Sequence, residues 1–271
     1  MQRLNLITWN INSVRLRQRL VERLLLDEAP DVLCLQETKC PNEQFPAAAF
    51  RKLGYGHLAL NGNSGGHRGY HGVAILSRVP LSDVTVRGFC GKTDGRYVRA
   101  TVTLGGAPVA IHNFYVPAGG DEPDPALNPK FEHKLAFLDE MLSFLPRACE
   151  APGIVVGDLN VAPYEMDVWS HRQMLRVISH TPEETTRFEA AREAAGYVDL
   201  GRRFVPHHER LFTWWSYRNK DWRKSDRGRR LDHVWAAPQL ADRASSFRVL
   251  REARDWPRPS DHVPVVATFE A

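Results

Sequence analysis

No long hydrophobic run and no low-complexity tract occurs in this 271-residue sequence, and these absences exclude several classes of protein. The longest apolar stretches are a handful of residues, such as Ile154–Val156, whereas a helix that crosses a bilayer needs about 20. With 43% hydrophobic and 25% charged residues, the composition is that of an ordinary globular protein, which excludes a disordered or collagen-like chain. We therefore expect a folded chain that neither spans nor binds a membrane.

Cysteines are few, and the four that occur are not spaced as pairs. Cys34 lies in an apolar run, as a buried free thiol does, and no CxxC spacing indicates a zinc site or a disulfide framework. The first ten residues, MQRLNLITWN, contain no extended apolar segment of the kind found in secretory signals. A reduced, cytoplasmic protein is the simplest interpretation.

Linkers and internal repeats are also missing from the sequence. No Gly/Ser-rich or Pro-rich stretch separates two halves, and no unit of about 20–50 residues recurs. We therefore expect one domain that spans residues 1–271.

Positive charge is concentrated in one part of the chain. The net charge is +4, but residues 202–230 contain ten Lys or Arg and three Asp or Glu, a local excess of seven positive charges. The rest of the chain therefore carries a net charge of −3. A solvated loop explains such a segment as well as a binding surface does, so charge alone leaves both interpretations open.

Short β-type runs recur along the chain, with amphipathic stretches between them. Leu16, Leu20 and Leu24 repeat every four residues and predict a helix, as does the pattern of Phe131–Leu145. A capping box at Thr181-Pro182-Glu183-Glu184 predicts a helix that ends at Gly196. Glycine clusters at Asn61–Gly72 and Gly119–Gly120 indicate loops. The predicted strands are Leu4–Trp9, Asp31–Gln36, Gly72–Leu76, Val98–Leu104, Val109–Val116, Ile154–Val156, Leu231–Ala236 and Val263–Phe269.

Many strands with a few helices, and no strict alternation of the two, predict a layered α/β fold with much antiparallel pairing. Polar residues repeatedly follow the hydrophobic runs, at the places where a rigid sheet presents functional groups on loops. Taken singly, a carboxylate after a strand is more often a turn or a helix cap. Five such strand ends together indicate a site, and their oxygen ligands suit Mg²⁺ or Mn²⁺ better than zinc. A metal site of this kind is suited to phosphoryl chemistry. The residues at the five ends are Asn10, Glu37, Tyr115, Asp158, Asn160, Asp261 and His262.

Six motifs in this sequence, in order, resemble those of the exonuclease III and AP endonuclease branch of the endonuclease/exonuclease/phosphatase superfamily. They span residues 8–262, which is nearly the whole chain. The motifs are Thr8-Trp9-Asn10-Ile11-Asn12-Ser13-Val14-Arg15, Leu35-Gln36-Glu37-Thr38-Lys39, Tyr115-Val116-Pro117, Gly157-Asp158-Leu159-Asn160, Arg230-Leu231-Asp232 and Ser260-Asp261-His262. The resemblance implies the family's four-layer α/β sandwich, in which two mostly antiparallel sheets pack face to face with helices outside.

The resemblance also assigns catalytic roles to single residues. Asp158 matches the aspartate that orients or deprotonates the attacking water, Asn160 and Tyr115 match groups that contact the scissile phosphate, and His262 contacts it while paired with Asp232. The choice between Asp158 and His262 as the group that takes the proton stays open.

Metal ligands follow from the same comparison. Glu37 matches the principal metal ligand, and the ion is expected to be Mg²⁺ or Mn²⁺. The full set of expected ligands is Asn10, Glu37, Asp158, Asn160, Asp261 and His262.

The basic segment becomes a predicted DNA interface, because cations neutralise phosphates and flat rings stack on an extruded sugar or base. The family places an aromatic residue at the position of Trp214 and an apolar one at that of Leu231 to line a pocket for an abasic sugar. For Phe212 and Trp215, a place in the core is the alternative. The cations expected at DNA are Arg223, Lys224, Arg227 and Arg229, with Arg218, Lys220 and Arg230 nearby in the segment.

The sequence departs from the family pattern at three places. Ser13 replaces a usual glycine, which is a small change, and Ala118 stands where Asn or Gln is frequent, which removes one contact to DNA phosphate. The segment 167–174 lacks a glycine common in abasic-site enzymes, so His171, Gln173 and Met174 bring bulk near the pocket. This bulk favours exonuclease activity and 3′-end cleaning over abasic-site incision.

The resemblance thus implies a Mg²⁺-dependent, monomeric DNA-repair nuclease that acts on duplex DNA. Its expected activities are 3′→5′ exonuclease, 3′-end cleaning and incision 5′ to abasic sites. The alternatives are a superfamily phosphatase or phosphodiesterase acting on a lipid or small molecule, and a DNA-binding protein that has lost catalysis.

Overall fold

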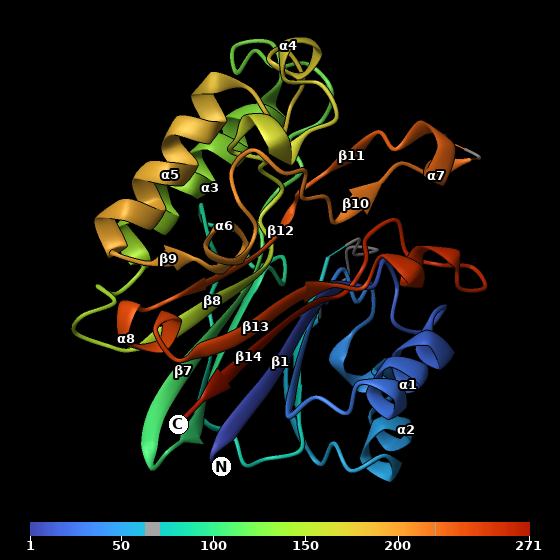
Figure 1. Cartoon of the computed structure of the whole chain (residues 1–271), viewed down its shortest axis with the longest axis vertical. Helices are drawn as coiled ribbons and strands as arrows, with labels where there is room; N and C mark the ends of the chain where they lie inside the picture. The colour runs from blue at the N-terminus through green and yellow to red at the C-terminus, as the bar shows by residue number, and fades with distance from the viewer. Residues whose placement is uncertain (63–70, 220) are drawn as a thin grey trace.

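Two six-stranded sheets packed face to face form the centre of the computed structural model, which describes residues 1–62, 71–219 and 221–271 (Figure 1). The predicted glycine-rich loop at Asn61–Gly72 therefore lies mostly outside the described residues, as does Lys220. Each sheet is antiparallel except for one parallel pair, β1 with β2 and β7 with β8. The expected four-layer α/β sandwich is confirmed.

The first sheet contains the two strands nearest the chain ends. Its order is β13 (Ala244–Val249), β14 (Val265–Glu270), β1 (Arg3–Asn10), β2 (Val32–Gln36), β4 (Val73–Ser77) and β3 (His57–Asn61). Outside it lie α1 (Gln18–Asp27) and α2 (Ala47–Lys52), as Figure 1 shows.

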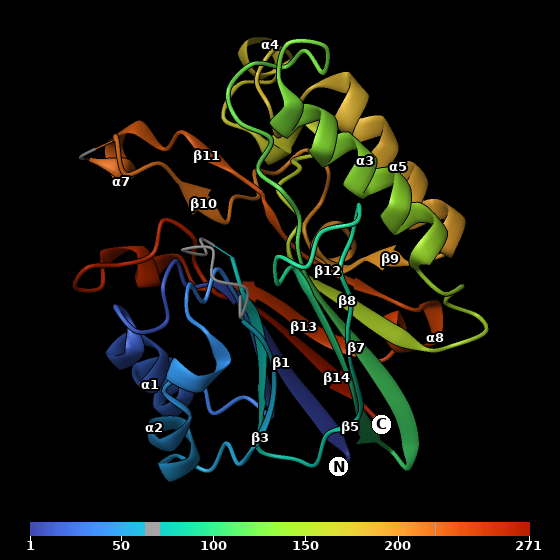
Figure 2. The same cartoon turned by 180° about the vertical axis from the view of Figure 1, so that it is seen from behind.

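The second sheet has the order β5 (Ser82–Val86), β6 (Tyr97–Leu104), β7 (Ala107–Tyr115), β8 (Gly153–Asp158), β12 (Asp232–Ala236) and β9 (Val198–Asp199). Figure 2 shows its outer face covered by α3 (Pro129–Phe144) and α5 (Pro182–Ala195). A separate ribbon pairs β10 (Trp214–Trp215) with β11 (Gly228–Arg229). The short helices are α4 (His171–Met174), α6 (Leu200–Phe204), α7 (Trp222–Ser225) and α8 (Pro238–Ala241).

Period-two alternation along β1 explains how the sheets pack. Leu4 and Leu6 face the second sheet and join the core between the sheets, whereas Ile7 and Trp9 face outward and pack under α1. Asn10 continues the inward face at the end of the strand, so its amide lies between the two sheets. The same alternation that builds the core therefore delivers a polar group to the edge where the site forms.

All eight predicted strands are present, with bounds that differ by one or two residues. The helix with a capping box is also confirmed, since Thr181 accepts from the amide of Glu184 and Gly196 ends the helix with a left-handed φ of 77°. Two expectations need correction. Leu16 is 59% exposed and precedes α1, because the helix begins only at Gln18. Six short or polar strands were not predicted: β3, β5, β9 and β13 at the sheet edges, and β10 and β11 in the separate ribbon.

Among the described residues, no helix combines the length and apolar character that a bilayer crossing requires.

Candidate active site

Strand register brings the predicted site residues together at one end of the sandwich. In the first sheet, Asn10 ends β1 beside Gln36 of β2, so Glu37 follows directly at the same edge. In the second, Tyr115 of β7 and Asp232 of β12 lie on either side of Asp158 of β8. The chain ends lie at the opposite end of the sandwich in Figure 1. Residues far apart in sequence therefore share one edge because the strands that carry them pair in this register.

A hydrogen bond and an ion pair, both buried, link Asp232, His262 and Asp158. His262 Nδ1 lies 2.8 Å from Asp232 Oδ2, and its Nε2 faces Asp158 Oδ2 at 3.6 Å. Thr213 Oγ1 donates to the same Asp232 oxygen at 2.6 Å and accepts the amide of Asp232, which fixes the carboxylate. The predicted pairing of His262 with Asp232 is thus present, and it orients the imidazole toward Asp158.

Burial and neighbouring charge shift the protonation of this chain in a definite direction. Burial would lower the pKa of His262, but the carboxylates of Asp232 and Asp158 outweigh it and raise that pKa. Burial raises the pKa of Asp158, and the carboxylates of Asp232 and Glu37 add to this against the opposing charge of His262. The two carboxylates therefore favour the protonated form of the imidazole that lies between them.

Glu37 forms the other half of the site. Its Oε1 accepts from Asn10 Nδ2 at 2.9 Å and from the hydroxyl of Tyr115 at 3.0 Å, and its Oε2 pairs with Lys39 Nζ at 2.8 Å. The amide of Asn10 also donates to Asp158 Oδ2 at 2.8 Å, so it bridges the two carboxylates. The structure therefore connects Glu37 and Asp158 through a single buried amide.

Asp261 lies on the flank of this group, tied by two side chains. Asn12 Nδ2 donates to its Oδ1 at 3.0 Å, and Trp214 Nε1 donates to its Oδ2 at 2.9 Å. The charge of His262 and these donors outweigh the effect of burial and lower the pKa of Asp261.

Ser13, which replaces a usual glycine, has a φ of 86°, a left-handed conformation that costs a side chain more than it costs glycine.

The donor set fits a hard divalent cation. The carboxylates of Asp158 and Asp232 and a nitrogen of His262 lie within 4.8 Å of one another. The two carboxylates offer ligand oxygens, whereas the imidazole offers a ligand nitrogen only in its neutral form. Asp232 Oδ1 is buried and has no hydrogen-bond partner among the described residues. A cation bound next to this oxygen would supply the polar partner that it lacks. Glu37 adds a carboxylate nearby, whereas Asn10 turns its amide nitrogen to the carboxylates and its Oδ1 accepts from the amide of Asn12.

An apolar cluster lies beside the hydrogen-bonded site. Trp214 and Trp169 pack against a small cluster that contains Met174 and Leu231, and Trp214 forms a β-bridge with His262. The predicted wall residues Trp214 and Leu231 are thus brought together next to the catalytic group. Gln173 is exposed, whereas His171 Nδ1 lies 2.8 Å from His180 Nε2.

The basic segment splits into an exposed and a buried part. Lys224 and Arg227 are exposed, and Arg227 lies over the ring of Trp169 at 4.6 Å. Arg223 is also exposed but forms an ion pair with Asp255. Arg229 is partly buried, since it donates to Ile178 O and Ser179 Oγ and lies 5.0 Å over the ring of Trp214.

Arg230 corrects the interpretation of this segment as a uniform DNA surface. It is 1% exposed and forms ion pairs with Asp167 and Asp199, which hold it in the interior. Arg202, at the other end of the segment, pairs with Asp167 in the same network. Phe212 and Trp215 are core residues. Part of the local positive charge therefore stabilises the fold and is not available to a ligand.

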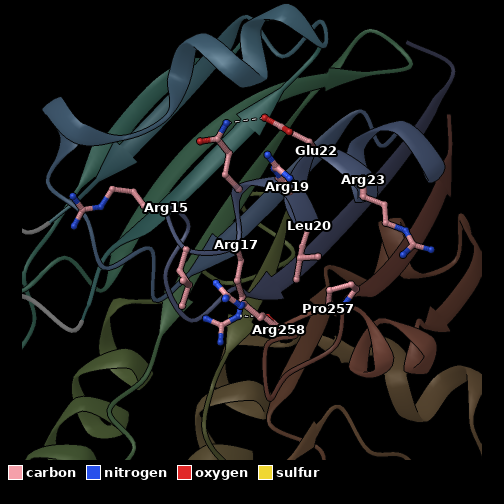
Figure 3. Close-up of a pocket in the computed structure, with 10 residues that line it drawn as sticks. Arg15, Arg17, Arg19, Leu20, Glu22, Arg23, Pro257 and Arg258 are labelled. Atoms are coloured by element: carbon pink, nitrogen blue, oxygen red, sulfur yellow. Dashed lines mark hydrogen bonds between the residues drawn. The ribbon is translucent and has the colours of Figure 1, made fainter.

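Sequence reasoning missed an arginine-lined cleft on the flank of the site. Five arginines, at 15, 17, 19, 23 and 258, line a cavity of about 680 Å³ at the start of α1 (Figure 3). Arg17 anchors it by donating to the carbonyls of Asn12 and Arg258. Four of the five arginines lie within residues 15–23, but the cleft also needs Arg258, which only the fold brings beside them.

Comparison with known proteins agrees with this geometry. The endonuclease/exonuclease/phosphatase family model matches residues 7–262. The chain belongs to this family. Exodeoxyribonuclease III of Haemophilus influenzae is 29% identical over an alignment of 275 positions, which covers 97% of this chain and 99% of that protein.

Solved structures place the chain in the same branch. An AP endonuclease from Archaeoglobus fulgidus has a TM-score of 0.88 and 32% identity, covering 99% of this chain and 100% of the other. The 3′ phosphatase NExo from Neisseria, bound to a product DNA hairpin, has a TM-score of 0.88 and 31% identity, with 99% and 100% covered. The protein is thus a hydrolytic nuclease of the exodeoxyribonuclease III and AP endonuclease branch, a phosphodiesterase of DNA repair.

Proposed function

We propose that this nuclease uses Mg²⁺ or Mn²⁺ to hydrolyse phosphodiesters in duplex DNA, with processing of 3′ ends as its main activity and incision 5′ to abasic sites as a second one. The observation that carries the proposal is the buried Asp158–His262–Asp232 chain, joined through Asn10 to Glu37 and Tyr115 at one sheet edge. We further propose that it acts as a single-domain monomer in the cytoplasm, where its four free cysteines suit a reducing environment.

Each residue has a role that follows from its contacts. Protonated His262, oriented by Asp232, binds a phosphate oxygen. The Tyr115 hydroxyl donates to Glu37 and the Asn160 amide donates to Asp158 and Val116 in this structure, and each becomes a further donor to the phosphate when the phosphate displaces one of these acceptors. Asp158 is the group that accepts the proton of the attacking water, because His262 already carries one. Glu37, Asn10 and Asp261 would hold the cation, whose charge would offset the negative charge that develops on the phosphate.

One parallel assay tests the proposal against its alternatives. The purified protein with Mg²⁺ receives an abasic-site duplex, a duplex with a recessed 3′ end and a phosphoinositide. We expect both DNA substrates to be cleaved, the recessed end faster, and the phosphoinositide to stay intact. Hydrolysis of the phosphoinositide alone would support the lipid phosphatase alternative. Binding of DNA without cleavage would support a DNA-binding protein that has lost catalysis.

The exposed part of the basic segment is expected to contact DNA phosphates. The double variant Lys224→Ala/Arg227→Ala should weaken duplex binding and flatten the slope of log K against log salt by up to about 1.8, roughly 0.9 for each lost contact. Fluorescence anisotropy over a salt series measures this slope. Arg51→Ala/Lys52→Ala, which removes two exposed cations on α2, is the matched control. An unchanged slope in the first variant would mean that these cations only solvate a loop.

The same measurement applied to Arg15→Ala/Arg19→Ala tests the arginine-lined cleft. Both side chains are exposed, whereas Arg17 is buried by its contacts to the backbone. We expect a comparable decrease in slope, because the cleft lies beside Asn12, which contacts Asp261. Equal slopes in this variant and the wild type would exclude the cleft from the DNA path.

The loop around α4 is expected to set the balance of the two activities. Met174 packs in the apolar cluster with Leu231, and His171 begins α4. His171→Gly should raise abasic-site incision several-fold relative to 3′-end cleavage. Removing this bulk admits an extruded sugar, whose flipping costs a few kcal/mol that the pocket must recover.

The measurement is the ratio of both rates on matched duplexes, and Arg172→Gly controls for loosening of α4. A parallel loss of both activities would show that His171 supports the common catalytic centre. No change in either would show that its contact with His180 has no effect on the pocket.

A further inference from the structure

Lys134 is a fully buried cation in the middle of α3, and its ammonium reaches the catalytic edge of the second sheet. Its side chain is 0% exposed and pairs with Glu184 of α5 at 2.5 Å. The same Nζ donates to the backbone carbonyl of Asn160 at 2.7 Å. Lysine is almost never fully buried unless it is paired. Packing of the helix alone does not explain a lysine at this position, because an apolar side chain would pack there equally well.

Asn160 needs that donor because of its backbone conformation. Its φ of 54° lies in the left-handed region, which costs about 1–2 kcal/mol for most residues and less for asparagine. The amide N–H donates to Asp158 Oδ1, and the side-chain amide donates to Asp158 Oδ2 and Val116 O. The backbone carbonyl of Asn160 turns away from these partners, toward α3. Lys134 holds it there.

The partner of Lys134 fixes the other side of the same loop. Glu184 Oε1 accepts from the amides of Ser179 and Thr181 at 2.6 and 3.0 Å. The carbonyl of Ser179 in turn accepts the amide of Ala162 at 2.6 Å. One buried ion pair thus tethers the loop after β8 at Asn160 directly and at Ala162 through Ser179.

We propose that Lys134 is a positioning residue for the hydrolytic reaction, which holds the left-handed backbone of Asn160 so that its side chain stays bonded to Asp158. Lys134 touches neither substrate nor cation in this role. The inference rests on the proposed catalytic role of Asn160. Loss of the donor releases the Asn160 carbonyl, so the carboxamide and the Asp158 carboxylate lose their fixed relation, while the DNA surfaces described above are unchanged.

The test variant is Lys134→Met/Glu184→Gln. Replacing both partners leaves no uncompensated buried charge, and a neutral pair of similar volume is tolerated in many proteins. Glutamine keeps an oxygen for the amides of Ser179 and Thr181. We expect kcat on a recessed 3′ end to fall on the order of ten- to a hundredfold, as misplacement of a catalytic group does. KM and DNA affinity should stay within about twofold, because the variant alters no expected phosphate contact.

The control is Arg187→Met/Asp139→Asn, which removes a second ion pair between α5 and α3 that does not touch the loop after β8. It should keep normal kcat. Thermal unfolding of both double variants checks that each still folds cooperatively. An equal loss of kcat in the control would show that Lys134 only packs the two helices, and would overturn the proposal.

A mutant cycle with Asn160→Ala separates this inference from the proposed function. If Lys134 acts through Asn160, Lys134→Met/Glu184→Gln should change kcat less than about twofold in the Asn160→Ala background. An undiminished further loss in that background overturns the positioning role and leaves Asn160 catalytic. Normal kcat in Asn160→Ala alone overturns the role of Asn160 in the proposed function, and the positioning inference with it.

Discussion

Asp158→Asn is expected to lower kcat by at least about 10²-fold, the scale on which a positioned general base contributes. An amide cannot accept the proton of the attacking water at neutral pH. It also cannot reproduce the carboxylate's contacts, because Asp158 Oδ2 accepts from both Asn10 and Asn160, and Oδ1 accepts the amide of Asn160. An NH₂ group in either orientation would face at least one of these donors.

The fold should survive this change. Burial raises the pKa of Asp158, so ionising the carboxyl in the folded protein costs free energy, and a neutral amide removes that cost. We therefore expect a cooperative thermal transition and nearly unchanged DNA affinity. Asp139→Asn, which removes an exposed carboxylate of α3, is the matched control. The measurement is kcat on a recessed 3′ end by steady-state kinetics. A near-normal kcat would show that Asp158 has only a structural role.

The position of the site could be predicted from the sequence because it depends on strand ends. Asn10, Tyr115 and Asp158 each end a hydrophobic run, and the pairing of β1 with β2 and of β7 with β8 carries them to one edge. The family resemblance supplied the arrangement of the two sheets and the outer helices in four layers, which hydrophobic periodicity alone does not determine.

Contacts between distant segments could not be predicted in this way. The cleft of Arg17 and Arg258 joins segments 241 residues apart, and the donation from Lys134 to Asn160 depends on how α3 lies over β8. Arg230 is one of several cations in its segment, and only the buried carboxylates of Asp167 and Asp199 distinguish it from the exposed ones. In each case, a contact between segments far apart in the sequence determines the role of the residue, and the sequence alone does not show that contact.

Strands at the margins of the sheets were missed for a related reason. All five residues of β5 are exposed, so no alternation of apolar and polar residues indicates that strand. It carries no site residue, and the prediction of the site therefore did not depend on it.

Glu37→Gln tests the metal half of the site. A neutral amide is a poorer ligand for a hard cation than a carboxylate, so the variant should lose most of its turnover at ordinary Mg²⁺ and recover part of it when Mg²⁺ is raised. Glutamine keeps an oxygen for Asn10 and Tyr115, whereas the ion pair with Lys39 is lost. The fold and the affinity for DNA should therefore be retained.

The decisive measurement is the Mg²⁺ dependence of kcat, compared with that of Glu43→Gln, an exposed glutamate in the segment after β2. A shift of the half-saturating Mg²⁺ concentration to higher values in Glu37→Gln alone would identify Glu37 as a ligand, because the change acts on cation affinity. An unchanged Mg²⁺ dependence would exclude this assignment. If turnover nevertheless fell, the hydrogen bond from Tyr115 to Glu37 would then account for the loss, since glutamine holds the Tyr115 hydroxyl less strongly than a carboxylate does.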